Sequence, residues 1–193
     1  MTAPAAIQAV AGRADRIHSA GEVAAAIDRM ARGIAAELAG SDPILLCVMN
    51  GGLILTGALA QRLDFPLRID YLHASRYRSA TTGGKIDFRV PPALDPRGRE
   101  LLVIDDILDE GDTLAAVLRY CRERGAARVL TAVLADKQRP RSADAPKADF
   151  VGLRVPDRFV FGSGMDYKGY LRNARGIYAI AREDEEGGQE EEQ

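Results

Sequence analysis

The sequence predicts one α/β domain with a central, mostly parallel β-sheet flanked by helices. Short, continuously apolar runs at 44–49, 101–104 and 129–134 have the length and composition of strands that are buried on both faces. Stretches of helical character lie between these runs, and alternation of strands with helices is typical of a parallel sheet. A chain of 193 residues is long enough for one substantial core but too short for two catalytic domains of ordinary size.

The first predicted helix runs from about residue 20 to residue 39. Ser19 and Glu22 have the spacing of a capping box, in which each side chain accepts a hydrogen bond from the backbone amide of the other residue. Gly40 is expected to end the helix. Apolar residues recur every three or four positions between these limits, as on the buried face of a helix: Val23, Ile27, Met30, Ile34 and Leu38.

Another helix and another strand follow the apolar run at 44–49. The turn Asn50-Gly51-Gly52 leads into a helix that ends near Leu63, and alternating apolar residues at 67–71 predict a strand. Residues 74–98 are rich in Gly, Pro, Ser, Thr and Arg and show no clear periodicity. A loop of this length usually has a function, so this segment is a candidate lid.

The second half of the chain repeats the order of strand and helix. After the strand at 101–104, a helix should begin near Thr113 and stop at Gly125, and the strand at 129–134 follows. Ligands of such sheets bind beyond the carboxyl ends of the strands. Residues 183–193 are dominated by Glu and Gly and should form an acidic, disordered tail, which leaves residues 1–182 for the domain.

The composition excludes several classes of protein. A formal net charge of -2 argues against a general affinity for nucleic acid. No apolar run approaches the roughly 18 residues that span a bilayer, and the N-terminus lacks a basic stretch before an apolar one, so we expect a cytoplasmic protein without a membrane partner. Cys47 and Cys121 have no CxxC partner and should be reduced, buried thiols.

The most informative segment is 101–113. Its strand should deliver Asp105 and Asp106 to the carboxyl edge of the sheet, and a short loop then opens a helix whose first amides are unpaired. Such amides bind phosphate, while Gly111 allows close approach and the Thr113 hydroxyl adds a donor. Paired carboxylates can accept hydrogen bonds from ribose hydroxyls or hold a hydrated Mg²⁺. The segment therefore predicts a ribose-phosphate site.

This segment resembles the phosphoribosyl pyrophosphate loop of the type I phosphoribosyltransferases. The shared pattern is an apolar strand, two acidic residues, two apolar residues and then Asp-x-Gly-x-Thr. The resemblance runs from about Ile44 to Ile180 and implies the fold of that family, with a small hood subdomain over the purine from the N-terminal segment and about 150–180. It also implies that the phosphoribosyl group is bound by Asp105, Asp106, Asp109, Glu110, Gly111, Asp112 and Thr113, with Asp109 as the catalytic base.

Two motifs resemble the parts of this family that handle the leaving group. The turn at 50–52 resembles the pyrophosphate-binding turn, so the resemblance assigns Asn50 and Gly51 to pyrophosphate. The segment from Ser75 through 84 resembles the mobile loop of the hypoxanthine and guanine branch, with Arg76 and Tyr77 as lid residues. Exclusion of water by such a loop would protect an oxocarbenium-like transition state.

Later motifs resemble the purine-binding parts of the same branch. Lys137 matches the lysine that donates to the exocyclic oxygen of a 6-oxopurine, an acceptor that adenine lacks. The segment 156–162 resembles one in which an aromatic ring, here Phe159, stacks on the purine while the backbone at Val160 reads the base edge.

The segment 164–173 matches the closing motif of the family. By the resemblance, Asp166 reads the purine through its backbone and holds Mg²⁺ through water, with Asp105 and Asp106 in the second shell of the ion, and Arg172 binds pyrophosphate. The resemblance thus implies a purine-salvage enzyme that transfers the 5-phosphoribosyl group from phosphoribosyl pyrophosphate to hypoxanthine or guanine, giving IMP or GMP and pyrophosphate.

Three positions depart from the family pattern. Asn50 stands where relatives often have lysine, which removes a charge near the leaving pyrophosphate. Glu110 and Asp112 add carboxylates to the phosphate loop, so their side chains must turn away from the ligand.

The sequence leaves several alternatives open. The same scaffold can serve xanthine or adenine, and the sequence does not rank hypoxanthine, guanine and xanthine. An RNA-binding regulator that keeps the loop is disfavoured by the low net charge, and a phosphorylated signalling domain would leave Thr113 and the C-terminal motif unused. The family also implies a homodimer or homotetramer.

Overall fold

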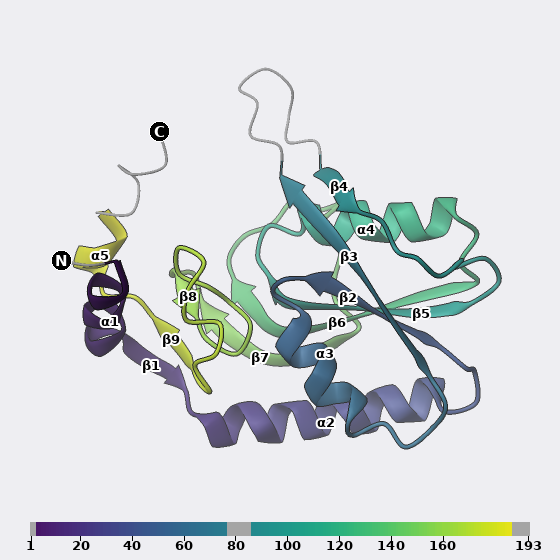
Figure 1. Cartoon of the computed structure of the whole chain (residues 1–193), viewed down its shortest axis with the longest axis horizontal. Helices are drawn as coiled ribbons and strands as arrows, with labels where there is room; N and C mark the ends of the chain where they lie inside the picture. The colour runs from purple at the N-terminus through teal and green to yellow at the C-terminus, as the bar shows by residue number, and fades with distance from the viewer. Residues whose placement is uncertain (1–2, 77–85, 187–193) are drawn as a thin grey trace.

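Two β-sheets organise the computed structural model, which describes residues 3–76 and 86–186 (Figure 1). The helices are α1 (Ala3–Arg13), α2 (Ala20–Leu38), α3 (Leu53–Ala60), α4 (Asp112–Glu123) and α5 (Arg182–Glu186). The strands are β1 (Asp15–His18), β2 (Ile44–Met49), β3 (Arg68–Arg76), β4 (Ile86–Val90), β5 (Glu100–Leu108), β6 (Arg128–Gln138), β7 (Phe150–Pro156), β8 (Val160–Phe161) and β9 (Ile177–Ala179). No helix within these two ranges is long and apolar enough to cross a membrane.

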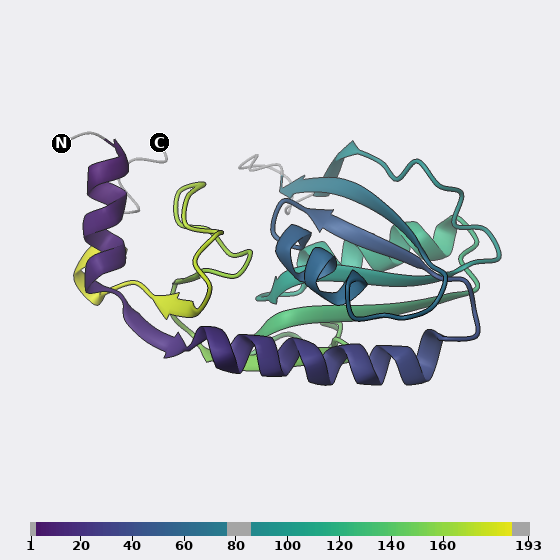
Figure 2. The same cartoon turned by 60° about the horizontal axis from the view of Figure 1, so that its bottom comes forward.

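The larger sheet has six strands in the order β4-β3-β2-β5-β6-β7. All neighbouring pairs are parallel except β3 with β4. Helices α2 and α3 cover one face of this sheet and α4 covers the other, as Figures 1 and 2 show from two directions. The predicted α/β architecture with a mostly parallel sheet is therefore confirmed.

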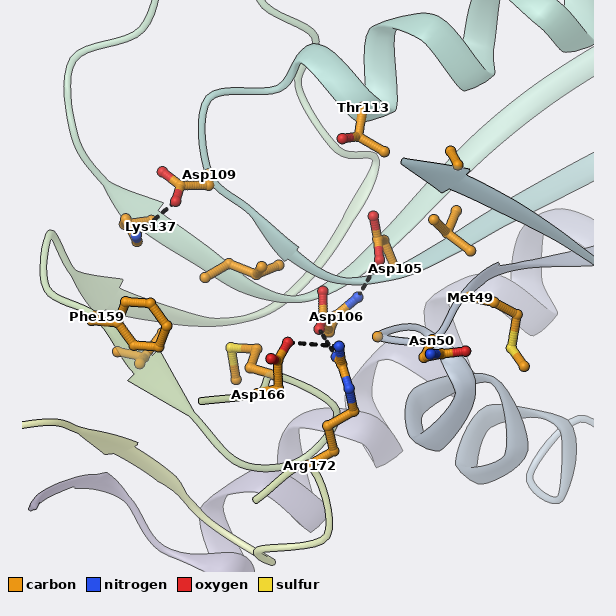
Figure 3. A pocket seen from close by; sticks show the side chains of 16 residues that line it. Met49, Asn50, Asp105, Asp106, Asp109, Thr113, Lys137, Phe159, Asp166 and Arg172 are labelled. Carbon is orange, nitrogen blue, oxygen red and sulfur yellow. Dashed lines mark hydrogen bonds and ion pairs between the residues drawn. The ribbon is translucent and has the colours of Figure 1, made fainter. Parts of the chain in front are cut away.

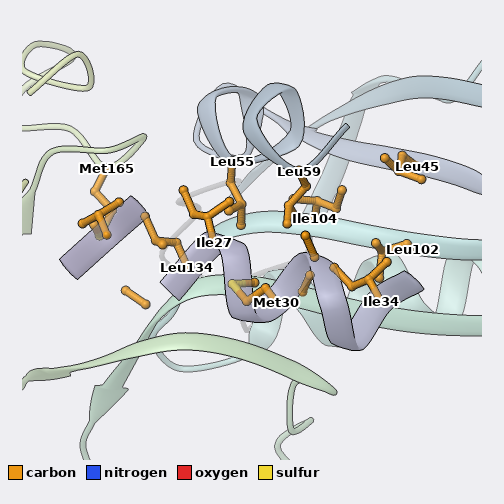
Figure 4. Close-up of a cluster of buried hydrophobic side chains, with 14 of the residues drawn as sticks. Ile27, Met30, Ile34, Leu45, Leu55, Leu59, Leu102, Ile104, Leu134 and Met165 are labelled. Atoms are coloured by element: carbon orange, nitrogen blue, oxygen red, sulfur yellow. The ribbon is translucent and has the colours of Figure 1, made fainter. Parts of the chain in front are cut away.

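Burial on both faces explains the continuously apolar strands. In β2, Leu45 packs into the cluster beneath α2 and α3, whereas its neighbours Ile44 and Leu46 pack into the cluster beneath α4. Side chains alternate between the two faces of a strand, so a strand covered on both sides must be apolar at every position. Figure 4 shows the first cluster, in which Leu102 and Ile104 of β5 meet α2 and α3.

Helix α2 begins where the capping box predicts. The Ser19 backbone N–H donates to Glu22 Oε2 at 2.8 Å, and the Glu22 backbone N–H donates to Ser19 Oγ at 3.3 Å. The predicted apolar stripe forms its buried face, which contains Val23, Ala26, Ile27, Met30, Ala31, Ile34 and Leu38. The helix thus starts by local capping and stays in place by packing on the sheet.

Strands β5 and β6 are longer at their carboxyl ends than the apolar runs indicated. The prediction ended them at 104 and 134, but β5 continues to Leu108 and β6 to Gln138. Leu108 is paired with Asp136, and Lys137 is paired with Val155 of β7. Backbone pairing with neighbouring strands does not require apolar side chains, so the sequence pattern ended earlier than the ladder of hydrogen bonds.

The predicted loop at 74–98 is partly a β-hairpin. Strand β4 pairs antiparallel with the end of β3. The centroid of its Phe88 ring lies 4.6 Å from the centroid of the Tyr120 ring on α4. This aromatic contact secures β4 although the local sequence has no strand pattern. Arg76 is the last residue of β3, and Tyr77 lies outside the described residues, so the lid remains a prediction.

The smaller sheet joins the two terminal regions of the chain. Its order is β1-β9-β8, and an apolar cluster with Ile7 and Val10 of α1 packs beside it. Neither α1 nor β1 was predicted, and β7, which fell inside the predicted hood at 150–180, belongs to the larger sheet. The first residues of the predicted tail form α5, where Asp184 Oδ1 pairs with Arg13 Nη2 at 2.5 Å.

Candidate active site

A cavity of about 350 Å³ lies at the carboxyl ends of β2, β5 and β6, between the larger sheet and the loops around β8 (Figure 3). At one end of the cavity are Asp109, Lys137 and Phe159, and at the opposite end are Met49 and Asn50. Most of the predicted site residues line it together: Asn50, Gly51, Asp105, Asp106, Asp109, Thr113, Lys137, Phe159, Val160, Asp166 and Arg172. Tertiary structure thus brings together five segments of the sequence: 50–51, 105–113, 137, 159–160 and 166–172.

The predicted phosphate loop lines an adjoining cavity of about 180 Å³. Glu110 and Gly111 line this second cavity, whereas Asp112 lines neither of the two and is the first residue of α4. Gly111 is the N-cap of α4 with φ of 95°, a left-handed conformation that favours glycine. Glycine offers no capping side chain, so the first amides of α4 lack a side-chain partner at the cap and suit an anion.

The acidic pair Asp105 and Asp106 is largely buried at the floor of the cavity. Asp105 Oδ1 accepts a hydrogen bond from the Asp106 backbone N–H at 2.9 Å, and Asp106 is only 8% exposed. Burial raises the pKa of Asp105 well above its usual range, and the neighbouring Asp106 carboxylate raises it further. Burial also raises the pKa of Asp106, although the Arg172 guanidinium opposes the rise.

Arg172 connects the acidic pair to the C-terminal motif. Its Nη2 lies 2.6 Å from Asp166 Oδ1, its Nη1 lies 3.6 Å from Asp106 Oδ2, and the same Nη1 donates to the Gly164 carbonyl at 2.7 Å. These contacts hold the guanidinium at the cavity wall. A guanidinium in this position is well shaped to bind a phosphate group from the side opposite α4.

The turn after β2 approaches the acidic pair very closely. A Cβ atom added at Gly51 would lie 2.2 Å from Asp106 Oδ2, so only glycine allows the backbone of the turn to reach this carboxylate. The peptide bond between Met49 and Asn50 is cis. The predicted pyrophosphate turn and the predicted ribose-binding acids are therefore in direct contact.

Asp109 is held by two cations. Lys137 Nζ donates to Asp109 Oδ2 at 2.7 Å, and Arg139 Nη1 donates to Asp109 Oδ1 at 2.8 Å. Partial burial raises the pKa of Asp109, but the hydrogen bonds and charges of Lys137 and Arg139 outweigh it, so the net effect lowers the pKa. Asp109 is thus an ionised carboxylate at neutral pH.

Two arginines to which the sequence assigned no role, Arg139 and Arg141, contact Asp109 from outside the cavity lining. Besides Arg139, Arg141 donates through Nη2 to the carbonyls of Leu108 at 2.7 Å and Lys137 at 2.6 Å. Their signal was present in the sequence, since both arginines follow Lys137 closely, but spacing alone did not show which oxygens they would reach.

Phe159 presents its ring to the cavity instead of to the core. The side chain is 46% exposed, and its ring packs edge to face against Tyr167 with 5.7 Å between centroids. An aromatic ring that is exposed to a cavity can stack on a flat heterocycle. Lys137, only 12% exposed, lies at the same end of the cavity and supplies the donor that such a ligand would meet.

The donors at this site fit Mg²⁺ only if the ion brings further oxygen ligands. Among residues 3–76 and 86–186, no group of three or more His, Cys, Asp or Glu side chains is close enough to hold a metal ion. Mg²⁺ commonly keeps several waters and binds through one or two carboxylates together with substrate phosphates. Asp105, Asp106 and Asp166 match that limited role.

The chain is similar to known proteins over most of its length. The model of the family described as phosphoribosyl transferase domain matches residues 13–168. The hypoxanthine-guanine phosphoribosyltransferase of Streptococcus pneumoniae is 31% identical over 163 residues, covering 84% of this chain and 90% of its own. That of Bacillus subtilis is 33% identical over 153 residues, covering 79% and 84%. A solved structure of the Trypanosoma cruzi hypoxanthine phosphoribosyl transferase has a TM-score of 0.84 at 25% identity and covers 91% of this chain and 95% of that one.

Burial of Asp105 and Asp106 should lower the stability of the folded protein by an amount that depends on pH. Replacement of Asp105 by Asn keeps an acceptor for the Asp106 amide but removes the group whose charge is buried, so we expect Asp105→Asn to raise the free energy of unfolding by about 1–3 kcal/mol at pH values above the raised pKa of Asp105. The folded protein holds the Asp105 proton more tightly than the unfolded chain does. The wild type therefore loses stability as pH rises from the ordinary pKa of an aspartate to the raised pKa of Asp105.

The difference in the free energy of unfolding between Asp105→Asn and wild type should therefore be small below the ordinary carboxyl pKa and largest above the raised pKa of Asp105. Urea unfolding at several pH values measures it. Asp144→Asn, at an exposed carboxylate, is the matched control and should change the free energy by less than about 0.5 kcal/mol. A gain that stays constant across the pH range would contradict this account of Asp105.

Proposed function

This chain belongs to the phosphoribosyltransferase family, and on that premise we propose that it is a purine-salvage enzyme. It transfers the 5-phosphoribosyl group from phosphoribosyl pyrophosphate to hypoxanthine or guanine, with IMP or GMP and pyrophosphate as products. The observation that carries the proposal is the cavity itself. A lysine, an exposed aromatic ring and an ionised carboxylate meet at one end of it, and a buried acidic pair and an uncapped helix start lie along it.

The two cavities suit the two halves of the sugar substrate. The 5-phosphate would bind the first amides of α4 together with the Thr113 hydroxyl, because a helix start attracts anions. The ribose hydroxyls would donate to Asp105 and Asp106, because burial disfavours the charged form of both carboxyls and raises their pKa values, and hydrogen-bond donors would offset that penalty. Glu110 and Asp112 contribute backbone amides to this loop.

Pyrophosphate is the leaving group at the other end of the site. The backbone at Asn50 and Gly51 and the guanidinium of Arg172 would bind it, and these groups already lie around Asp106. Mg²⁺, held through water by Asp166 with Asp105 and Asp106 nearby, would neutralise the negative charge that develops as the bond from the anomeric carbon to pyrophosphate breaks. Preorganised positive groups of this kind lower the barrier because they need no rearrangement during the reaction.

The purine would bind at the end of the cavity that holds Lys137 and Phe159. The Phe159 ring stacks on the base, the backbone at Val160 and Asp166 reads its edge, and Lys137 donates to the 6-oxygen. As purine N9 forms its bond to the anomeric carbon, Asp109 accepts or holds the proton at N7. The base gains a glycosidic bond and loses a proton, while pyrophosphate leaves with the bonding electrons.

The proposal also includes a lid and an oligomer. Arg76 and Tyr77 would form the lid, which would close over the reacting atoms and exclude water. The protein would act as a homodimer or homotetramer, for which exposed apolar side chains on α3 and β3, such as Leu53 and Ile69, offer surface.

The function is tested by pyrophosphate release. We expect release from phosphoribosyl pyrophosphate with hypoxanthine or guanine and Mg²⁺, and little release with adenine or without the metal, because Lys137 needs a 6-oxygen acceptor and the departing phosphates need a cation. An enzyme-coupled pyrophosphate assay with hypoxanthine, guanine, xanthine and adenine measures this. Release with no dependence on the base would overturn the proposal.

Asp109→Asn tests the general base. Because Asn cannot accept the purine proton as a carboxylate does, we expect the turnover number to fall at least about a hundredfold while binding of GMP changes little. Steady-state kinetics and calorimetry measure the two quantities. Asp28→Asn, which removes a carboxylate paired with Arg62 at 2.5 Å on the surface of α2, is the control and should keep wild-type turnover. Wild-type turnover in Asp109→Asn would remove Asp109 from this role.

Lys137→Gln tests base selection. A neutral amide both donates and accepts, so the substitution should reduce the ratio of kcat/KM for guanine over adenine by about tenfold or more. The measurement is kcat/KM for both bases in parallel. Lys147→Gln, at an exposed lysine, should leave the ratio unchanged. If Lys137→Gln also left it unchanged, Lys137 would not face the purine.

A further inference from the structure

Asp109 is paired with two cations, and only one of them lines the cavity. Lys137 Nζ is 2.7 Å from Oδ2, and Arg139 Nη1 is 2.8 Å from Oδ1. Lys137 lines the cavity together with Asp109, whereas Arg139 is not among its lining residues in the described part of the chain. The two oxygens of the carboxylate are thus held from different sides, one from within the cavity and one from outside it.

Under the proposed function, Lys137 serves two acceptors. In the structure it neutralises Asp109, and during the reaction it donates to the 6-oxygen of the purine. The attraction between two charges falls as they separate, so each movement of the ammonium toward the base weakens its hold on the carboxylate. Asp109 then needs a second cation that stays in place when the cavity is occupied.

Resting on the proposed function, we propose that Arg139 is the resident counter-ion of Asp109, a positioning residue that holds the carboxylate while Lys137 turns to the base. Arg139 can stay because it does not occupy the space of the ligand. The chain around it is also fixed, since the nearby Arg141 donates to the carbonyls of Leu108 and Lys137 and so ties the end of β5 to the end of β6.

Other charged groups around this pair favour the same role. Arg139 Nη1 lies 3.8 Å from Glu110 Oε1, and Arg139 Nε lies 3.9 Å from Asp157 Oδ1, so the guanidinium faces carboxylates from two segments of the chain, 109–110 and 157. Besides Lys137 and Arg139, the cation beside Asp109 is Arg141, whose guanidinium donates to the Asp109 backbone carbonyl. Both partners of Asp109 contribute to its lowered pKa, which partial burial opposes.

The first test does not depend on catalysis. In the free protein, carboxyl ¹³C NMR should show that Asp109 titrates below the ordinary range of an aspartate and that Arg139→Gln moves its pKa upward, because one of two cations is lost. Arg139→Lys, which keeps the charge, should restore most of the wild-type value. Arg128→Gln is the matched control, since Arg128 pairs with Glu37 at 2.6 Å at the other end of β6 and should not affect Asp109.

The second test measures the reaction. With Arg139→Gln, Lys137 is the remaining cation on the Asp109 carboxylate, so the KM for guanine at neutral pH should rise about threefold to tenfold. The acid limb of the kcat profile should move to higher pH, while kcat on the alkaline plateau stays within about twofold of wild type. Arg139→Lys should recover the wild-type profile, and Arg128→Gln should match wild type throughout.

The outcomes separate this inference from the proposed function. An Asp109 pKa and a guanine KM that are unchanged in Arg139→Gln would overturn the role of Arg139 even if the wild-type enzyme is active. An equal loss of turnover at every pH, with a lowered melting temperature and no recovery in Arg139→Lys, would show a merely structural tether and would also overturn it. Failure of wild type to release pyrophosphate concerns the function itself, and the NMR titration then still decides whether Arg139 sets the charge of Asp109.

Discussion

The parallel pairing of β5 with β6 is the constraint on which the rest of the site depends. The register that pairs Leu108 with Asp136 places Asp109 just beyond one strand and Lys137 beside it on the other, close enough for an ion pair of 2.7 Å. Both strands are covered by helices on both faces. A shift of register by one residue would turn every buried side chain to the wrong face, so the core fixes the geometry of the reacting groups.

The charges of the site are arranged so that its two ends differ. Burial raises the pKa values of Asp105 and Asp106, whereas hydrogen bonds and charges from Lys137 and Arg139 lower the pKa of Asp109 in spite of its partial burial. In the proposed reaction, the first end would meet the ribose hydroxyls and a metal ion, and the second would meet the purine and its N7 proton. Their surroundings thus shift the pKa values of three aspartates in one short segment in opposite directions.

The smaller sheet completes the cavity. Strand β1 from the N-terminal region pairs with β9 from the C-terminal region, and β8 pairs with β9, so the segment from Phe159 to Arg172 is held over the carboxyl ends of the larger sheet. Without this closure Phe159, Asp166 and Arg172 would lie on a free loop. Contacts between distant parts of the chain thus convert half of the site from a sequence motif into a rigid wall.

The sequence alone determined the alternation of buried strands and amphipathic helices, the start of α2 at its capping box, and the acidic pair followed by a helix start, because each depends on local spacing and burial period. Only tertiary structure decided how far β5 and β6 extend, that β4, α1 and β1 form, and that Arg139 and Arg141 reach Asp109. These features arise from strand pairing and ion pairs between residues far apart in the chain, which leave no periodic trace in the sequence.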